Sequence, residues 1–256
     1  MKFLFAPIFF LCFSFQAVAS SQLERVSEPK MAKFYDEYGN QQGNPLFDLG
    51  SWHGFLLPNK SNSSGFAGPA IIFEEYMLYF GEYIEKLSVS VDGGAYQALS
   101  SLPNTMSSEL GYFKQTFRSN AFTIDIYLSF ASERSSVIDT RIVNLSNKPL
   151  ELSLKWQGQL TQHWESETDS YVWQVKPEIS NSALSWHFNQ SRDTWHKLNQ
   201  NNARFQIARS IPSQSVFNSL QQSYSSVGKT VVLPNNTQLI TTVLSYTHNQ
   251  QESDSE

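Results

Sequence analysis

The stretch FTIDIYLSF at residues 122–130 alternates apolar and polar side chains along its whole length. Successive side chains of a β-strand point to opposite faces of a sheet, so this two-residue period predicts a strand with one buried face. LELSLKW at residues 150–156 repeats the pattern, with leucines and Trp156 at alternate positions. These two stretches indicate an antiparallel sheet that covers an apolar core.

Further stretches rich in β-branched and aromatic residues predict more strands. They are AIIFEEYMLYF (70–80), KLSVSV (86–91), SVIDTRIVNL (136–145), YVWQV (171–175), ALSWHF (183–188), ARFQIARS (203–210) and QLITTVLSYTH (238–248). Turn-forming residues separate them at 92–94, 146–149 and 233–236. About ten short strands without a sustained helical period predict an all-β protein, a single large antiparallel β-sandwich.

The first 19 residues have the features of a secretory signal peptide. Lys2 precedes an apolar run, and Ala17-Val18-Ala19 supplies the small residues of a cleavage site near Ala19. The only cysteine, Cys12, lies within this segment. We therefore expect an exported protein without disulfides, in a bacterial periplasm, with no membrane attachment after cleavage.

These features divide the chain into four parts. We expect a signal peptide at 1–19, a polar extension at 20–44, the sandwich at 45–248 and a disordered tail at 249–256.

The charge pattern excludes some classes of partner. The formal net charge is −5 and only 16% of the residues are charged, with no long block of either sign. Nucleic acid is therefore not an expected partner. A surface rich in Asn, Gln, Ser and Thr suits an uncharged polyhydroxy ligand better than a phosphate.

The familiar catalytic and metal motifs are missing from the sequence. VGKT at 227–230 resembles the end of a phosphate-binding loop, but it lacks the first glycine and VVLP follows it in place of a helix. The five histidines form no metal-binding pair, and no GxSxG elbow occurs. We expect no metal and no cofactor.

Glu74 and Glu75 form the most obvious carboxylate pair. Neighbours on a strand point to opposite faces, so these two cannot flank one sugar as general acid and base. We interpret them, together with Asp48, as candidate structural carboxylates.

Several stretches together resemble the N-terminal region of bacterial periplasmic glucosidases of glycoside hydrolase family 63. They are FDLGSWHGFLLP (47–58), SSGFAG (63–68), the strand that contains EEY (74–76), IYLSFASERSSVIDTRI (126–142), SNKPLELSLKWQG (146–158) and SYTH (245–248). The resemblance extends from about Tyr38 to His248. It implies a sandwich of the super-β-sandwich type that precedes an (α/α)6 barrel.

In that family the barrel carries the general acid and general base of an inverting α-glucosidase. This sequence has no stretch that matches the barrel's catalytic motifs, so we assign no catalytic residue. The expected function is that of a non-catalytic sandwich domain, in truncated or split form, inactive alone. Its expected partners are the barrel, in cis or in trans, and an α-glucoside or oligosaccharide reached through that barrel.

The stretch FDLGSWHGFLLP is rich in large apolar side chains, which leaves two interpretations open. Trp52, His53, Phe55 and Phe66 are candidate contacts to sugar or to the barrel, since an indole face can stack on a pyranose and an imidazole can donate to a hydroxyl. Residues 61–68 would then form a flap near the substrate. Alternatively, Phe47, Leu49, Trp52 and Leu57 fill the sandwich core.

Two other functions stay open at this point. One is a stand-alone periplasmic carbohydrate-binding sandwich without catalysis, favoured by six tryptophans and a neutral polar surface. The other is a small complete enzyme whose carboxylates come from Asp48, Glu74, Glu75, Asp125 and Asp139.

Overall fold

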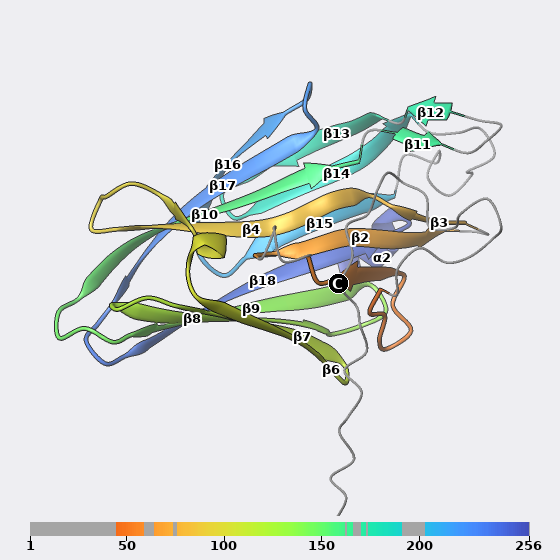
Figure 1. Cartoon of the computed structure of the whole chain (residues 1–256). Coiled ribbons are helices and arrows are strands. Elements are labelled where there is room, and N and C mark those ends of the chain that lie inside the picture. The colour runs from red at the N-terminus through yellow and green to blue at the C-terminus, as the bar shows by residue number, and fades with distance from the viewer. Residues whose placement is uncertain are drawn as a thin grey trace, which may run out of the picture.

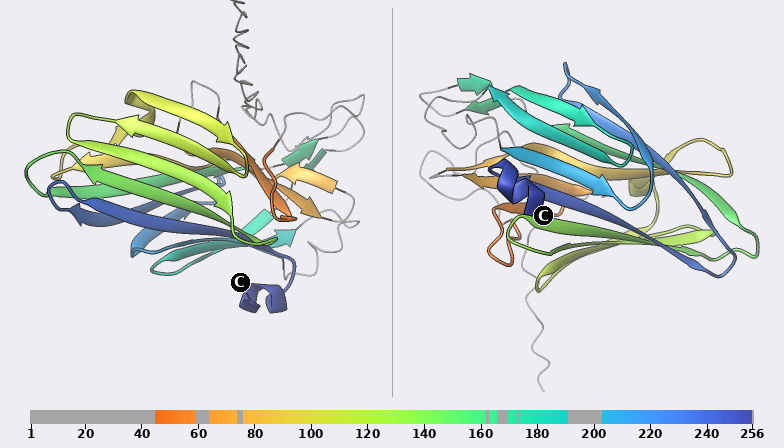
Figure 2. Two further views of the ribbon diagram at one scale, coloured as in Figure 1. Left: turned by 90° about the horizontal axis from the view of Figure 1, so that it is seen from below. Right: turned by 180° about the vertical axis from the view of Figure 1, so that it is seen from behind.

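Two large antiparallel sheets face each other and make up most of the molecule (Figure 1). The computed structural model describes residues 45–58, 64–73, 76–161, 163–165, 170–172, 174–190 and 203–255. The all-β prediction and the sandwich prediction are confirmed. Figure 2 shows the same two layers from below and from behind, with the C-terminal helix α2 outside them.

The first sheet has eight strands in the described part of the chain. Its order is β1 (His53–Leu56), β2 (Phe66–Phe73), β4 (Gly81–Val91), β10 (Leu150–Leu160), β17 (Ser223–Val232) and β16 (Ser213–Asn218), with β3 (Tyr76–Tyr79) paired to β2 and β5 (Gln97–Ala98) paired to β4.

The second sheet also has eight described strands. Its order is β13 (Gln174–Ile179), β14 (Ala183–Gln190), β15 (Arg204–Arg209), β18 (Thr237–Thr247), β9 (Ser135–Asn144), β8 (Phe122–Phe130), β7 (Tyr112–Arg118) and β6 (Asn104–Glu109). The remaining elements are the pair β11 (His163–Glu165) and β12 (Ser170–Val172), the 3-10 turn η2 (Leu99–Ser101) and the helix α2 (Gln250–Ser255).

The strands with the clearest alternation follow the predicted faces. β8 covers residues 122–130, and its apolar side chains are buried while the intervening ones are half-buried. β10 continues the pattern of 150–156 as far as Leu160. The stretch 70–80, expected as one strand, is instead two strands, β2 and β3, that pair with each other.

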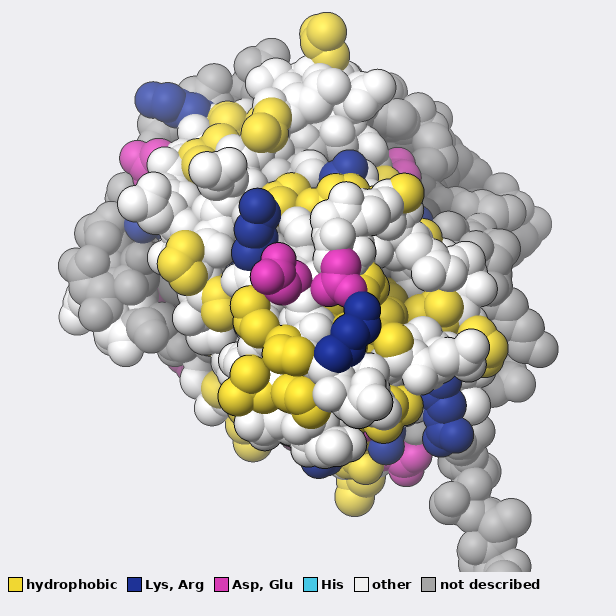
Figure 3. All heavy atoms as spheres, turned by 90° about the vertical axis from the view of Figure 1, so that its left-hand side faces the viewer, with side chains coloured by type: hydrophobic (Ala, Val, Ile, Leu, Met, Phe, Trp, Pro, Cys, Tyr) yellow, Lys and Arg dark blue, Asp and Glu magenta, His cyan; other side chains and the backbone are white. Residues whose placement is uncertain are grey.

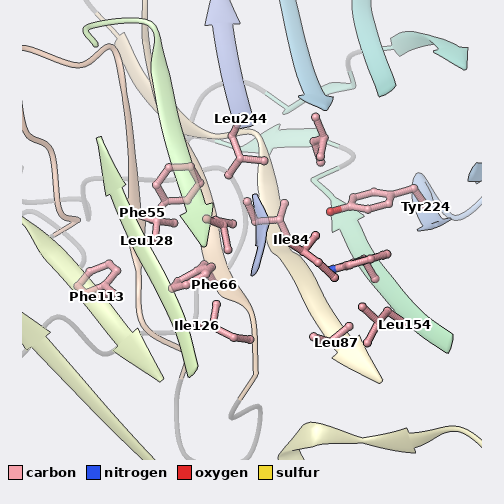
Figure 4. Close-up of a cluster of buried hydrophobic side chains, with 14 of the residues drawn as sticks. Phe55, Phe66, Ile84, Leu87, Phe113, Ile126, Leu128, Leu154, Tyr224 and Leu244 are labelled. Carbon is pink, nitrogen blue, oxygen red and sulfur yellow. The ribbon is translucent and has the colours of Figure 1, made fainter. Parts of the chain in front are cut away.

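One continuous core fills the space between the sheets, as Figure 4 shows for part of it. β2, β4, β10 and β17 contribute from one sheet, and β7, β8, β15 and β18 from the other. The sequence VGKT lies inside β17, which confirms that it is not a phosphate-binding loop.

Candidate functional site

Three of the four candidate contact residues lie inside the core. His53, Phe55 and Phe66 are fully buried, and Figure 4 shows Phe55 and Phe66 among the core side chains. The Phe66 ring stacks on Phe113 at 6.2 Å between ring centroids. These three side chains have no exposed surface on which a sugar could lie, whereas Leu49, one of the residues expected in the core, is exposed.

His53 is held as a neutral imidazole in an aromatic environment. Its Nε2 lies 3.1 Å from Ser136 Oγ, and its ring lies 5.6 Å from Phe55 and 5.7 Å from Phe130. Burial, together with the nearby charge of Arg134, lowers the pKa of His53 to about 3. The imidazole is therefore uncharged at neutral pH and links β1 to β9 through a hydrogen bond.

Trp52 is the one candidate contact residue that is only half-buried. The Arg134 guanidinium carbon lies 5.0 Å from the centroid of the indole, and the His248 ring meets it edge-on at 5.2 Å. The backbone N–H of Trp52 donates to the Glu133 carbonyl at 2.9 Å, and its own carbonyl accepts from Ile72 at 2.7 Å. Trp52 thus joins the 131–135 turn to the end of the sandwich.

The same cluster anchors the C-terminal helix, and this corrects the prediction of a disordered tail at 249–256. Glu252 Oε1 forms an ion pair with Arg134 Nη2 at 2.8 Å, and its Oε2 accepts from the His248 N–H at 2.7 Å. Asn249 Oδ1 accepts from the Glu252 N–H at 2.9 Å and caps the helix. The composition of this short polar tail does not predict tertiary contacts, so the sequence provides no reason to expect an ordered helix here.

The stretch before β1 forms a turn. Leu49 and Gly50 have positive φ angles of 51° and 71°, and Asp48 Oδ1 accepts from the Leu49 N–H at 2.8 Å. Asp48 therefore has a structural role in this turn. Gly54 has another reason to be glycine, since a Cβ there would overlap the Phe47 ring.

The remaining predicted residues divide into two groups. Glu74 and Glu75 lie outside the described residues. Ser64 and Phe66 of the expected flap are buried, and the Gly65 carbonyl accepts from Gln115 Nε2 at 2.6 Å. This described part of the flap belongs to the core.

Sequence reasoning missed a buried carboxylate, Glu85 on β4. Glu85 Oε1 lies 2.5 Å from Arg209 Nη2, and both side chains have almost no exposed surface. The Tyr224 hydroxyl donates to Glu85 Oε1 at 2.7 Å and accepts from the Glu85 N–H at 3.1 Å. The Arg209 guanidinium carbon also lies 4.7 Å from the centroid of the Trp156 ring.

A β-bulge in β4 turns Glu85 inward. The pairing with β10 shifts between Gln157 and Gln159, so that two residues of β4 oppose Gly158. Glu85 itself has a φ of 54°, and both Ile84 and Glu85 are buried. The sequence gives one sign of the bulge. Leu87 and Val89 occupy odd-numbered positions of β4, whereas the buried Ile84 occupies an even-numbered position, so the two-residue alternation shifts between them.

The electrostatics of this cluster are those of a closed structural site. Burial raises the pKa of the Tyr224 hydroxyl, and the charge of Glu85 raises it further. The cluster joins β4 and β17 of the first sheet to β15 of the second. The Glu85 and Arg209 side chains of this cluster have almost no exposed surface.

The described residues contain no group of three or more His, Cys, Asp or Glu side chains that could hold a metal ion. In the same residues, no helix has the length and apolar character needed to cross a membrane.

The fold defines the chain as a large antiparallel β-sandwich domain. Residues 24–256 match the family model described as the N-terminal domain of the glucosidase YgjK. The chain therefore belongs to this family of glucosidase N-terminal domains.

Several solved structures are similar to a large part of the chain. A protein assigned as a kojibiose phosphorylase from the human microbiome matches at a TM-score of 0.43 and 14% identity, over 87% of this chain and 29% of its own. The Slr1438 protein from Synechocystis sp. PCC 6803 matches at a TM-score of 0.47 and 10% identity, over 86% of this chain and 99% of its own. A 4-alpha-glucanotransferase from Thermococcus litoralis matches at a TM-score of 0.42 and 8% identity, over 84% of this chain and 39% of its own. These likenesses are distant and concern the fold alone, and the chain spans less than a third of the phosphorylase.

Proposed function

We propose that this chain is the non-catalytic N-terminal sandwich of a periplasmic inverting α-glucosidase of glycoside hydrolase family 63, where it braces the (α/α)6 catalytic barrel. The family match over residues 24–256 carries the proposal. An inverting hydrolase needs a general acid and a general base about 6.5–9.5 Å apart across the scissile bond. In this proposal the barrel supplies both.

The end of the described chain supports the bracing role. β18 lies between β15 and β9 and leads directly into α2. Arg134, Glu252 and His248 fix α2 on the sandwich. Any domain that follows would start from a fixed point, and the sandwich could therefore hold it in one orientation.

The first experiment asks whether a barrel accompanies the sandwich. Sequencing the gene through and beyond the codon for Glu256, and its neighbouring genes, should reveal an (α/α)6 barrel in cis or in trans. The sandwich and barrel together should release glucose from an α-glucoside, and proton NMR should detect the β-anomer first because the reaction inverts the configuration. The sandwich alone should release none.

Two results would contradict this proposal. One is the absence of any barrel in or beside the gene, and the other is glucose release by the purified sandwich alone. Cell fractionation tests the location: the protein should appear in the periplasm with Ser20 as its first residue.

A further inference from the structure

A groove lies on the outer face of the first sheet, between the β4–β5 connection and β17. Its volume is about 510 Å³, and its lining residues come from β4, from 93–96, from β10 and from β17. Small-ligand sites in proteins have volumes of roughly 300–1,000 Å³. The groove is therefore large enough for part of an oligosaccharide.

Hydrogen bonds fix the wall of this groove formed by residues 92–96. The Asp92 N–H donates to the Glu151 carbonyl at 2.8 Å, and the Gly94 N–H donates to the Val91 carbonyl at 2.9 Å. Ser90 Oγ donates to the Gly94 carbonyl at 2.6 Å. Because the wall is already ordered, a ligand would not have to order it on binding.

Tyr96 presents an aromatic ring at the groove. Its hydroxyl lies 2.6 Å from Ser153 Oγ, while 44% of the residue is exposed. Lys155 Nζ lies 5.8 Å from the ring centroid, which is near the limit for a cation–π contact. The ring is held in place and part of its surface faces solvent.

The groove carries side chains of both charges. Glu151 and Lys229 line the groove with one carboxylate and one ammonium group, Lys155 adds a second ammonium group beside the Tyr96 ring, and Ser153 adds a hydroxyl. Figure 3 shows acidic and basic side chains side by side on this end of the molecule, with hydrophobic side chains around them. A phosphate or a polyanion would meet a carboxylate here, whereas a neutral ligand with many hydroxyls would find donors and acceptors.

We propose that this groove binds a neutral oligosaccharide without cleaving it. Sugars combine an apolar C–H face, which suits the Tyr96 ring, with a rim of hydroxyls, which suits Glu151, Ser153 and Lys229. The choice of a sugar among neutral ligands rests on the proposed function, whereas the groove geometry does not. Figures 1 and 2 place the β4–β5 connection at the end of the sandwich away from α2.

Titration of the full chain with maltotetraose, followed by amide chemical shifts in nitrogen-15 NMR spectra, tests this proposal. The shifts should move in residues 90–96, 151–153 and 227–231. Tyr96→Ala should weaken binding by about tenfold or more, and Ser153→Ala by about threefold. The matched control is Tyr112→Ala, since Tyr112 is a similarly exposed tyrosine on the other sheet, at 37%. This control should bind like the wild type.

The proposal fails if maltotetraose moves no resonance or moves only resonances outside the groove. It also fails if Tyr96→Ala, shown to be folded by its spectrum, binds like the wild type, or if a sulfated oligosaccharide binds the groove more tightly than maltotetraose does. The proposed function is tested separately, by the barrel and its glucose release. The groove proposal can therefore fail while the proposed function stands, and the reverse also holds.

Discussion

At the scale of single residues, burial decides the chemistry of the Trp52-His53 pair. Trp52 precedes β1 and is half-buried against the core, whereas His53 is the first residue of β1 and is fully buried. His53 enters the core beside Phe55 and Phe130, and Trp52 meets Arg134 and His248 near the surface. The imidazole is a structural group, and its protonation is linked to folding.

His53 should make the protein less stable in acid. Its pKa is about 3 in the folded protein and 6.5 in the unfolded chain, so between these values the unfolded chain binds more protons. Stability is fully present above pH 6.5 and decreases as the pH falls towards 3, by up to about 1.4 kcal/mol per pH unit from this group. Urea unfolding across this range measures the slope.

His53→Gln should flatten that slope, because an amide does not titrate. The control is Gln214→Ala, since Gln214 is an exposed side chain on β16 that does not titrate. The control should keep the slope of the wild type. An unchanged slope in His53→Gln would show that another group causes the acid sensitivity.

At the scale of elements, the bulge in β4 depends on close packing against Gly158 of β10. A Cβ on Gly158 would overlap the Tyr224 ring. Tyr224 in turn holds both the side chain and the backbone of Glu85. The bulge, the tyrosine and the glycine therefore form one packing unit.

Gly158→Ala should destabilise the sandwich by about 1–3 kcal/mol, because the added methyl group displaces Tyr224. Denaturant unfolding measures this change in the free energy of unfolding. Gln157→Ala is the matched control, since the side chain at 157 is half-buried on the opposite face of β10 and should change stability little. Equal effects of the two variants would contradict the packing argument.

The anchor of α2 also belongs to this scale. Glu252→Gln removes the charge that pairs with Arg134, so α2 should detach more often from the sandwich. Amide hydrogen exchange should become about tenfold faster in residues 248–255 and stay unchanged in β8. Gln251→Ala, an exposed change in the same helix, should leave the exchange unaltered.

At the scale of the whole molecule, the Glu85–Arg209 pair joins the two sheets through the core. Breaking a buried pair leaves one charge without its partner, which costs about 3–5 kcal/mol. Glu85→Gln and Arg209→Met should each destabilise the protein by about that amount. The double variant should be more stable than either single variant, because no isolated charge stays buried.

A double-mutant cycle on urea unfolding measures this coupling between Glu85 and Arg209. Additive single effects would mean that the two charges act independently, which would contradict the ion pair. Ser153→Ala on the outer face is a control that should leave the fold and its stability intact.

The sequence predicted local features well and long-range features poorly. The alternation at 122–130 reflects a local rule, and β8 follows it residue by residue. β17 was not predicted, because Gly228 and Lys229 interrupt its apolar pattern and its place comes from pairing with β10. The Glu85–Arg209 pair joins residues 124 positions apart, and only the bulge brings them together.

The candidate site shows the same division. The composition of 47–58 indicated either a core segment or a contact surface, and neighbouring residues carry no local signal that separates the two. The structure places His53 and Phe55 in the core and ties Trp52 to α2 through Arg134. The groove at Tyr96 is formed by β4 and the β4–β5 connection together with β10 and β17, which lie far from them in the sequence. No short sequence motif therefore predicts it.

The central position of β18 has a mechanical consequence. A pulling force on the C-terminus would load the hydrogen bonds to β15 and to β9 at once and in shear, along most of the strand. β1, the first described strand, lies at the edge of the other sheet, and its ladder partner is β2 alone. Under tension the domain should therefore yield at its N-terminal edge first and keep its C-terminal attachment until the sandwich itself ruptures.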